Sequence, residues 1–227
     1  MQNGYRHEFK YLISKQSADL LRLRLPCIME RDVHAGQTGR YTIRSLYFDD
    51  FSYSALEEKV SGINYREKYR IRYYNYDTSV LKLECKEKHG SLTRKTAAAI
   101  TQKESEILQC GGIVPLPADS PALAQTLWKK CRYGGLRPRV LVDYDRTPFV
   151  CRDGNTRITL DENLRTRPYD TELKASSGAM VPVLDADQVI LEVKFDDFLP
   201  GYLDAALADI PKASMAISKF ALCLSLT

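Results

Sequence analysis

The chain has 227 residues, of which 44% are hydrophobic and 27% are charged, which provides enough apolar material for a sizeable core. The formal net charge of +4 is too small to indicate nucleic-acid binding through bulk charge. No apolar run approaches the length of a membrane span, and the start MQNGYRHEFK lacks the apolar stretch of a signal peptide, so we expect a soluble, cytoplasmic protein.

The first part of the chain alternates strands with short helices. β-Branched and aromatic residues predict strands over 5–13 and 40–49. Between them, Ser17 is the expected cap of a helix that runs to Leu25 and ends at Pro26. Another short helix and three strands of an antiparallel meander, joined by turn residues, are predicted over 52–60, 66–75, 79–88 and 93–100.

The second part of the chain contains a strong hairpin signal, Asp153-Gly154-Asn155, between strands expected over 137–151 and 156–161. A polar loop is expected over 166–180, followed by a strand over 188–195. Helices are predicted over 101–109, from a cap at Asp119 or Ser120 to Tyr133, over 202–209, and over 215–225 behind a cap at Ser214.

These elements predict an α+β protein. The sequence shows no internal repeat, low-complexity segment or linker, so residues 1–227 are expected to form a single domain. Long antiparallel meanders remove their exposed edges by closing on themselves. We therefore expect a closed antiparallel β-barrel of about eight strands, with helices around it and room for a ligand inside.

The cysteines and histidines give no sign of a metal centre or a redox centre. The six cysteines include no CxxC pair, and the three histidines show no ligand spacing. We therefore expect reduced, buried thiols and no zinc site.

Charged side chains alternate with other residues on strand after strand. In KYRIRYY, Lys68, Arg70 and Arg72 occupy every second position. A strand turns successive side chains to opposite faces, so these charges lie on one side of the sheet. The same alternation recurs in other segments and places on one face Lys82, Glu84, Lys86 and Lys88; Arg6, Glu8 and Lys10; Arg157, Thr159 and Asp161; and Glu192 and Lys194.

Two explanations of this charged face are open. It is either the solvated face of an antiparallel sheet or the lining of a barrel that holds a polyanion. The surplus of basic residues favours the second, because guanidinium and ammonium groups suit phosphates. A few carboxylates among them suit a divalent metal that bridges phosphate oxygens.

In their order along the chain, these motifs resemble the VTC-type polyphosphate polymerase domain, a branch of the CYTH-like triphosphate tunnel metalloenzymes. The opening YRHEFKYLI is similar to the family's first tunnel strand, and Lys59 and Arg66 follow in the family's order. Arg6 replaces the first carboxylate of the superfamily's ExExK pattern, which favours the polymerase branch over triphosphatases and cyclases. The other matching segments are RSLYFDD, YRIRYY, LKLECKEK, VDYDRTPFV, TRITLDENL, LEVKFDD and SKF.

The resemblance implies a metal-dependent enzyme that transfers the γ-phosphate of ATP to a growing polyphosphate chain. Its implied catalytic residues are Arg70, Arg72, Lys86, Arg157 and Lys219, and its substrate-binding residues are Lys10, Lys59, Lys68, Lys82, Arg146 and Lys194. Manganese or magnesium is expected at Glu192, with Glu8 and Glu84 as further candidates.

Several assignments stay open at this stage. Asp49 and Asp50 favour a strand-end turn, and five cations are equally compatible with a tunnel rim or an ordinary surface, namely Lys82, Lys88, Arg94, Lys95 and Lys194. The alternatives to a polymerase are an inorganic triphosphatase, which uses water as acceptor, and a non-catalytic polyphosphate sensor. The expected partners are ATP, triphosphate and polyphosphate, without nucleic acid, and any membrane partner would be a separate protein.

Overall fold

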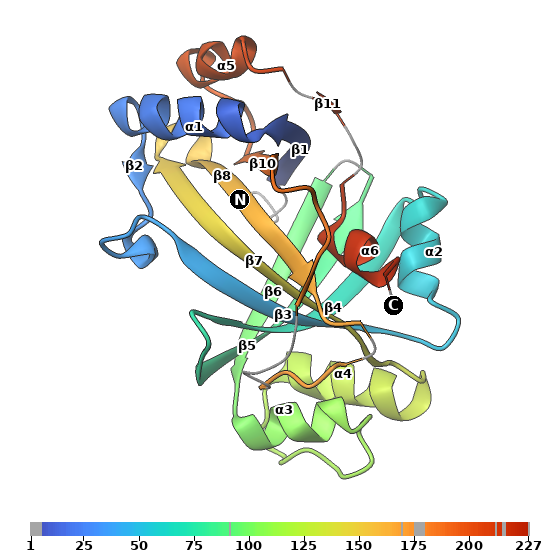
Figure 1. The fold of residues 1–227 in the computed structure, drawn as a ribbon. Coiled ribbons are helices and arrows are strands. Elements are labelled where there is room, and N and C mark those ends of the chain that lie inside the picture. The colour runs from blue at the N-terminus through green and yellow to red at the C-terminus, as the bar shows by residue number, and fades with distance from the viewer. Residues whose placement is uncertain are drawn as a thin grey trace.

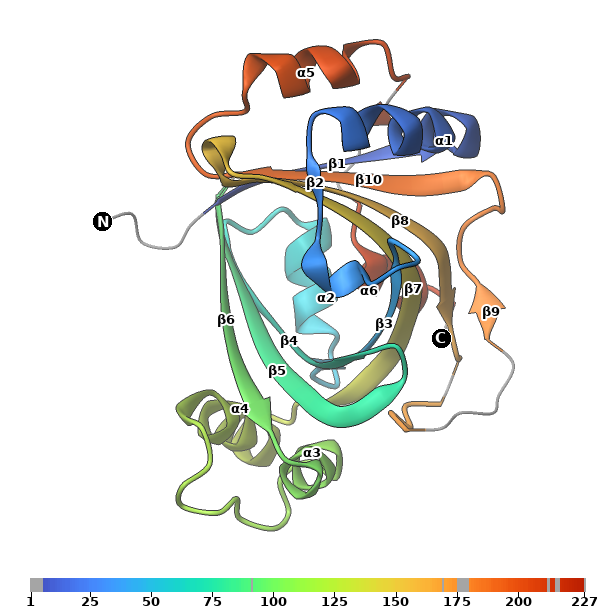
Figure 2. The same ribbon diagram turned by 90° about the vertical axis from the view of Figure 1, so that its left-hand side faces the viewer.

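In a computed structural model of the chain, the described residues are 6–90, 92–168, 170–174, 180–211, 213–214 and 217–226. Eight antiparallel strands form a ring in the order β7-β3-β4-β5-β6-β1-β10-β8, and β8 pairs back with β7 (Figures 1 and 2). In chain order they are β1 (Arg6–Ser14), β3 (Tyr41–Asp49), β4 (Tyr65–Tyr74), β5 (Asp77–His89), β6 (Leu92–Ile100), β7 (Arg137–Cys151), β8 (Thr156–Thr166) and β10 (Gln188–Phe195).

The ring confirms the α+β class and the expected eight strands surrounded by helices. Its strand pairs differ in length: β3 and β4 pair from Ile43 to Phe48, whereas the described part of the β6–β1 pairing consists of Arg6 with Thr93 and His7 with Leu92. Three two-residue strands extend the sheet, namely β2 (Glu30–Arg31), β9 (Val181–Pro182) and β11 (Ala213–Ser214).

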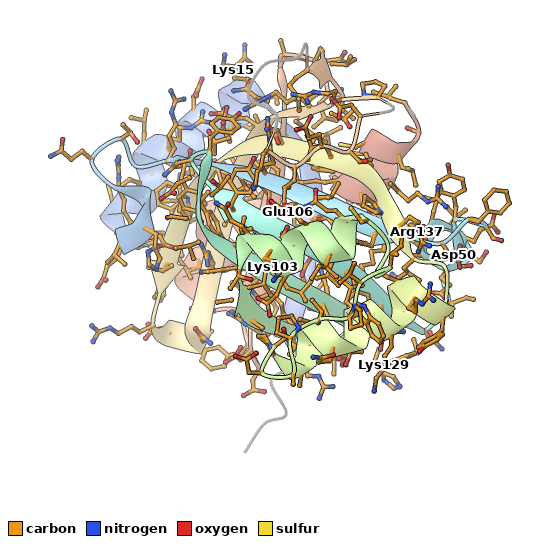
Figure 3. The ribbon with its side chains drawn as sticks, turned by 90° about the horizontal axis from the view of Figure 1, so that it is seen from below. Lys15, Asp50, Lys103, Glu106, Lys129 and Arg137 are labelled. Carbon is orange, nitrogen blue, oxygen red and sulfur yellow. The ribbon has the colours of Figure 1, made fainter. Side chains whose placement is uncertain are left out.

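Helices cover the outside of the ring on two opposite sides (Figure 2). On one side, α1 (Lys15–Arg24) and α5 (Gly201–Ala208) pack their Leu21 and Leu203 side chains with Leu191 of β10. On the other, α3 (Gln102–Gln109) and α4 (Ala122–Tyr133) pack against the outer faces of β4 and β5, and Figure 3 shows this helix pair from below. The apolar side of the strand alternation therefore faces outward, under the helices.

Two more helices, α2 (Ser54–Val60) and α6 (Lys219–Leu224), lie next to each other at one opening of the ring (Figures 1 and 2). Asp49 accepts hydrogen bonds from the backbone N–H groups of Ala55 and Leu56, and Asp50 accepts one from Ser54. The strand-end role expected for both aspartates is confirmed, and it fixes the start of α2 beside the ring.

Three helix caps were predicted wrongly. Ser14 rather than Ser17 caps α1, because the Ser14 hydroxyl accepts from the Ser17 N–H. The last helix begins at Lys219 behind Ser218, whereas Ser214 belongs to β11 and pairs with Tyr11 of β1. No side chain caps α4, whose preceding residue is Pro121, so neither Asp119 nor Ser120 has the expected role.

Other boundaries moved for tertiary reasons. Strand β8 continues past the predicted end at residue 161, because Thr166 pairs with Val142. Parts of the expected loop at 166–180, the first residue of the strand expected at 5–13 and the first residues of the helix expected at 215–225 lie outside the described residues. All six cysteines are free thiols, although Cys27 and Cys110 are exposed rather than buried. No described helix is both long enough and apolar enough to span a membrane.

Candidate anion-binding cavity

The ring encloses a cavity of about 480 Å³. All eight ring strands contribute to its lining, together with α2 and α6. The alternation of each strand explains this convergence: inward positions carry the charged residues, while outward positions carry the apolar residues that the helices cover. The charged face is therefore the inside of the ring, not the solvated face of an open sheet.

The cavity lining is strongly basic. It contains fifteen Lys and Arg residues against two carboxylates, Glu8 and Glu192. The remainder of the chain then holds eighteen of the thirty-three basic residues and twenty-seven of the twenty-nine acidic ones. The modest net charge thus conceals a basic cavity lining, while the remainder of the chain, which includes the buried acids Glu84 and Asp161, is net acidic.

Glu8 and Glu192 lie among lysines on the adjacent strands β1 and β10. In this register Lys10 pairs with Glu192 and Glu8 pairs with Lys194, so charges of opposite sign alternate in both directions. The Lys10 ammonium lies 2.9 Å from the Glu8 carboxylate and 3.7 Å from that of Glu192. Lys194 lies 3.1 Å from Glu192 and 3.7 Å from Glu8. The two lysines therefore hold both carboxylates in one cluster.

Both carboxylates are ionised. Burial alone would raise the pKa of Glu8, but Lys10 and Lys194 hold it well below its usual range, and Lys86 donates to both carboxylate oxygens at 2.6 and 2.7 Å. The pKa of Glu192 is lowered in the same way, since Lys194, Lys10 and Arg146 outweigh burial. Ionised carboxylate oxygens are the ligands that Mg²⁺ and Mn²⁺ prefer.

Glu84 occupies a different position. It is buried behind the cavity lining and accepts from Arg70 Nε at 2.7 Å and from Lys95 at 3.0 Å, while Arg72 lies 3.5 Å away. Arg70 and Arg72 outweigh the effect of burial and hold the pKa of Glu84 well below its usual range. Its contacts favour the role of a counter-ion that fixes two arginines, rather than the expected role of metal ligand.

A second buried counter-ion, Asp161, holds the cations on the opposite wall. Arg146 donates to its two oxygens at 2.6 and 2.7 Å, and Lys219 lies 2.6 Å away. Arg146 also donates to Glu192 at 3.0 Å, which links this group to the lysine cluster. Arg157 is held separately, by Asp32 at 2.7 Å and by the Tyr41 hydroxyl at 2.9 Å.

Lys68 differs from these cations because no described carboxylate lies within ion-pair distance of its ammonium. Its Nζ lies 3.5 Å from the Ser218 hydroxyl and 4.5 Å from the centre of the Phe220 ring. Burial, followed by the neighbouring charges of Arg66 and Lys10, lowers the pKa of Lys68 to about 7. An anion in the cavity would supply the missing negative charge.

The structure also brings two tyrosines into the site that sequence reasoning missed. The Tyr47 hydroxyl accepts from Arg70 at 2.6 Å, and Arg70 and Arg72 outweigh burial to lower its pKa. The Tyr144 hydroxyl accepts from Arg72 at 3.2 Å, and the Arg146 guanidinium and Lys219 ammonium lie 5.4 and 4.8 Å from its ring centre. In VDYDRTPFV, Tyr144 lies two positions before Arg146 and therefore on the same face of the strand. This alternation could have identified Tyr144 as a site residue from the sequence.

Most of the predicted site residues lie together. The predicted residues that line the cavity are Glu8, Lys10, Lys59, Lys68, Arg70, Arg72, Lys86, Arg146, Arg157, Glu192, Lys194 and Lys219. Lys82 pairs with Arg72 but is exposed, with its ammonium 5.4 Å from the Tyr74 ring centre, so it lies beyond the cavity lining. Lys88, Arg94 and Lys95, whose place the sequence left open, line the cavity, as do Arg6 and Arg66.

The carboxylates of the cavity fit a divalent metal whose remaining ligands come from the substrate and water. The described residues contain no group of three side chains able to enclose a metal ion. Glu8 and Glu192 supply two carboxylates on the cavity wall. Mg²⁺ is commonly bound in this way, through one or two carboxylates, with phosphate oxygens and water completing its shell.

Comparisons with known proteins agree with this geometry. The sequence has no significant match among curated proteins. Solved structures that share its fold include a putative adenylyl cyclase, HpAC1, from Hippeastrum (15% identity, TM-score 0.58, covering 97% of this chain and 95% of that one), and a putative adenylate cyclase from Bacillus halodurans (14%, 0.54, 93% and 95%). The model of the VTC domain matches residues 5–227, so the chain belongs to the VTC domain family.

Proposed function

We propose that this chain is a polyphosphate polymerase that transfers the γ-phosphate of ATP to the end of a polyphosphate chain inside the ring. The observation that carries the proposal is the cavity itself, with fifteen basic residues against two carboxylates, in a chain of the VTC domain family. Such a lining suits an extended anion with many equivalent phosphates better than a ligand with a single charge.

The cations of the cavity have the organisation that phosphoryl transfer requires. This reaction depends on in-line positioning and charge neutralisation more than on covalent chemistry by the protein. Arg70 and Arg72 are fixed by Glu84, and Lys219 is fixed by Asp161. Because they are already held in place, they need little reorganisation when charge develops on the transferring phosphoryl group. Lys86 and Arg157 complete the proposed catalytic set, and the proposed substrate-binding residues are Lys10, Lys59, Lys68, Arg146 and Lys194.

We assign the divalent metal, manganese or magnesium, to Glu192 and Glu8. When bound, it would neutralise phosphate oxygens and orient them for transfer. Lys10 and Lys194, which contact both carboxylates, keep them close together on neighbouring strands. Glu84 is left out of this assignment because it does not line the cavity.

The acceptor in this reaction needs no strong general base, because the terminal phosphate of polyphosphate is already ionised. The described cavity lining includes no His, Cys or Asp side chain that would serve as a base or nucleophile. This lining is compatible with transfer between phosphates.

The test is incubation of the purified protein with ATP and Mn²⁺, resolved on a polyphosphate gel beside an orthophosphate assay. A ladder of long anionic product with release of ADP is the expected result. Orthophosphate without chains would instead identify a triphosphatase, the alternative favoured by HpAC1, which is described as having a dominant triphosphatase activity. Tight tripolyphosphate binding with neither product would identify a sensor.

A further inference from the structure

A second cavity, of about 970 Å³, lies outside the ring. We call it the lateral cleft, and it is formed over the outer faces of β7 and β8 by α1, segment 31–40 and segment 180–188. Figure 2 shows α1, β2 and β9, which belong to these walls; β2 pairs with β7 and β9 pairs with β8. No described residue lines both cavities, so the lateral cleft is separate from the proposed polymerase site.

The lateral cleft has an apolar floor. Its accessible part consists of the half-buried Val183 and Leu184, whereas Phe149 of β7 and Leu164 of β8 lie beneath the cleft, each only 1% exposed. Phe149 is at an outward position, with its side chain in the core beneath α1. The floor therefore offers a flat or hydrophobic group a surface that the charged ring cavity lacks.

The rim of the lateral cleft is basic, with five cations, Lys15, Arg22, Arg31, Arg40 and Arg165, against Glu162 and Asp185. Two of the cations are already engaged. Arg22 lies 2.6 Å from Glu162, and Arg165 donates to the Tyr76 hydroxyl at 2.9 Å. Among the described residues, Glu162 is the one carboxylate within ion-pair distance of Arg40, at 3.9 Å. Arg22 lies closer to Glu162 and already balances its charge.

Arg31 and Lys15 are the two rim cations whose charge is not balanced by a nearby carboxylate in the described part of the chain. Among the described residues, no carboxylate lies within ion-pair distance of either side chain. Gly39 has a φ of +68°, and a Cβ at this position would collide with the Arg31 guanidinium. The absence of that side chain lets Arg31 lie across segment 31–40, next to Arg40 in the cleft wall.

Arg31, Arg40 and Lys15 thus stand beside an apolar floor in a cleft large enough for a small-molecule ligand. Arginine forks pair with phosphate oxygens through two parallel hydrogen bonds, and the floor suits a planar ring. We propose that the lateral cleft binds a nucleoside phosphate, with its phosphates on Arg31 and Arg40 and its base against the floor at Val183 and Leu184.

The experiment is photo-crosslinking of the full chain with 8-azido-ADP, followed by peptide mapping. We expect labelled peptides from segments 31–40 or 180–188, and at least about tenfold less labelling there in Arg31→Ala and Arg40→Ala. Both arginines are exposed, so both variants are expected to fold. Arg132→Ala, which removes an exposed arginine from α4, is the matched control. Labelling confined to the ring cavity, or unchanged labelling in both variants, would overturn the proposal.

Competition at the same peptides tests the role of the floor. Pyrophosphate carries phosphates without a base, and we expect it to protect the cleft peptides at least about tenfold less effectively than ADP. Equal protection would show that the base does not use the apolar floor and would contradict a nucleoside phosphate as the ligand. Polyphosphate synthesis by Arg31→Ala and Arg40→Ala should match the wild type, which separates this proposal from the proposed polymerase activity.

Discussion

Two groups of cations in the ring differ in how their charge is balanced. Arg70 and Arg72 share the buried carboxylate of Glu84, so their positions are fixed before any substrate arrives. Lys68, on the same strand, has no carboxylate partner among the described residues, and its pKa falls to about 7. The difference indicates two tasks: fixed arginines stabilise developing charge, while an uncompensated lysine gains most when a polyanion enters.

Removal of a fixed arginine should have the largest effect. Arg72→Ala is expected to lower kcat by about 10²–10³-fold, which is the effect of removing one hydrogen-bond donor from other preorganised sites. The measurement is polyphosphate synthesis from ATP, with circular dichroism as a check on folding. Arg132→Ala on α4 is the control, and wild-type turnover by Arg72→Ala would contradict the catalytic role of this arginine.

Removal of the counter-ion should act on stability. Glu84→Gln leaves two buried arginines without a negative charge, so we expect it to lower the free energy of unfolding by about 3 kcal/mol. Chemical denaturation measures this change, and Glu106→Gln, at an exposed acid on α3, should change stability by less than about 0.5 kcal/mol. A stable Glu84→Gln variant with a raised Mn²⁺ requirement would instead support the metal-ligand role.

The uncompensated lysine should make anion binding depend on pH. Burial lowers the pKa of Lys68, and also that of Lys86, to about 7, whereas a bound anion favours the charged forms, so binding takes up protons. Tripolyphosphate affinity should therefore fall as pH rises from about 6 to 8, by up to about tenfold per unit for each of these lysines. Calorimetry in buffers of different ionisation enthalpy measures the uptake. Lys68→Met should remove the part of it that is due to Lys68, and unchanged uptake would contradict the assignment.

The smallest effect is expected at Lys82. This lysine has the charge and the strand position of a site residue, but it is exposed and lies beyond the cavity lining. Lys82→Ala should change kcat/KM by less than about twofold, because an exposed cation is well screened. A loss comparable to that of Arg72→Ala would extend the functional site past the cavity.

Much of this site could be predicted because strand alternation is a local property. KYRIRYY and LKLECKEK assign Lys68, Arg70, Arg72 and Lys86 to one face whatever the remainder of the chain does. Tyr144 lies on a face that the same alternation defines. Only its contacts with Arg72, Arg146 and Lys219 identify it with the site.

The errors occurred where several local choices were nearly equivalent. Ser14, Ser17, Ser214 and Ser218 are all competent helix caps, and the pairing of β11 with β1 excluded Ser214. The assignment of Glu84 as a candidate metal ligand stays a prediction, and it came from the resemblance of LKLECKEK to a tunnel strand. The contacts of Glu84 with Arg70, Arg72 and Lys95 depend on how β4, β5 and β6 pair, which alternation does not specify.

The sequence by itself determined the strands, the two faces of each strand and the surplus of positive charge on one of them, because side-chain direction and charge are local properties. Only the tertiary structure decided that this face turns inward, that Glu8 and Glu192 share two lysines, and that Glu84 and Asp161 are counter-ions. Those outcomes depend on which strands become neighbours around the ring, and that choice is made by long-range packing of the outer apolar faces.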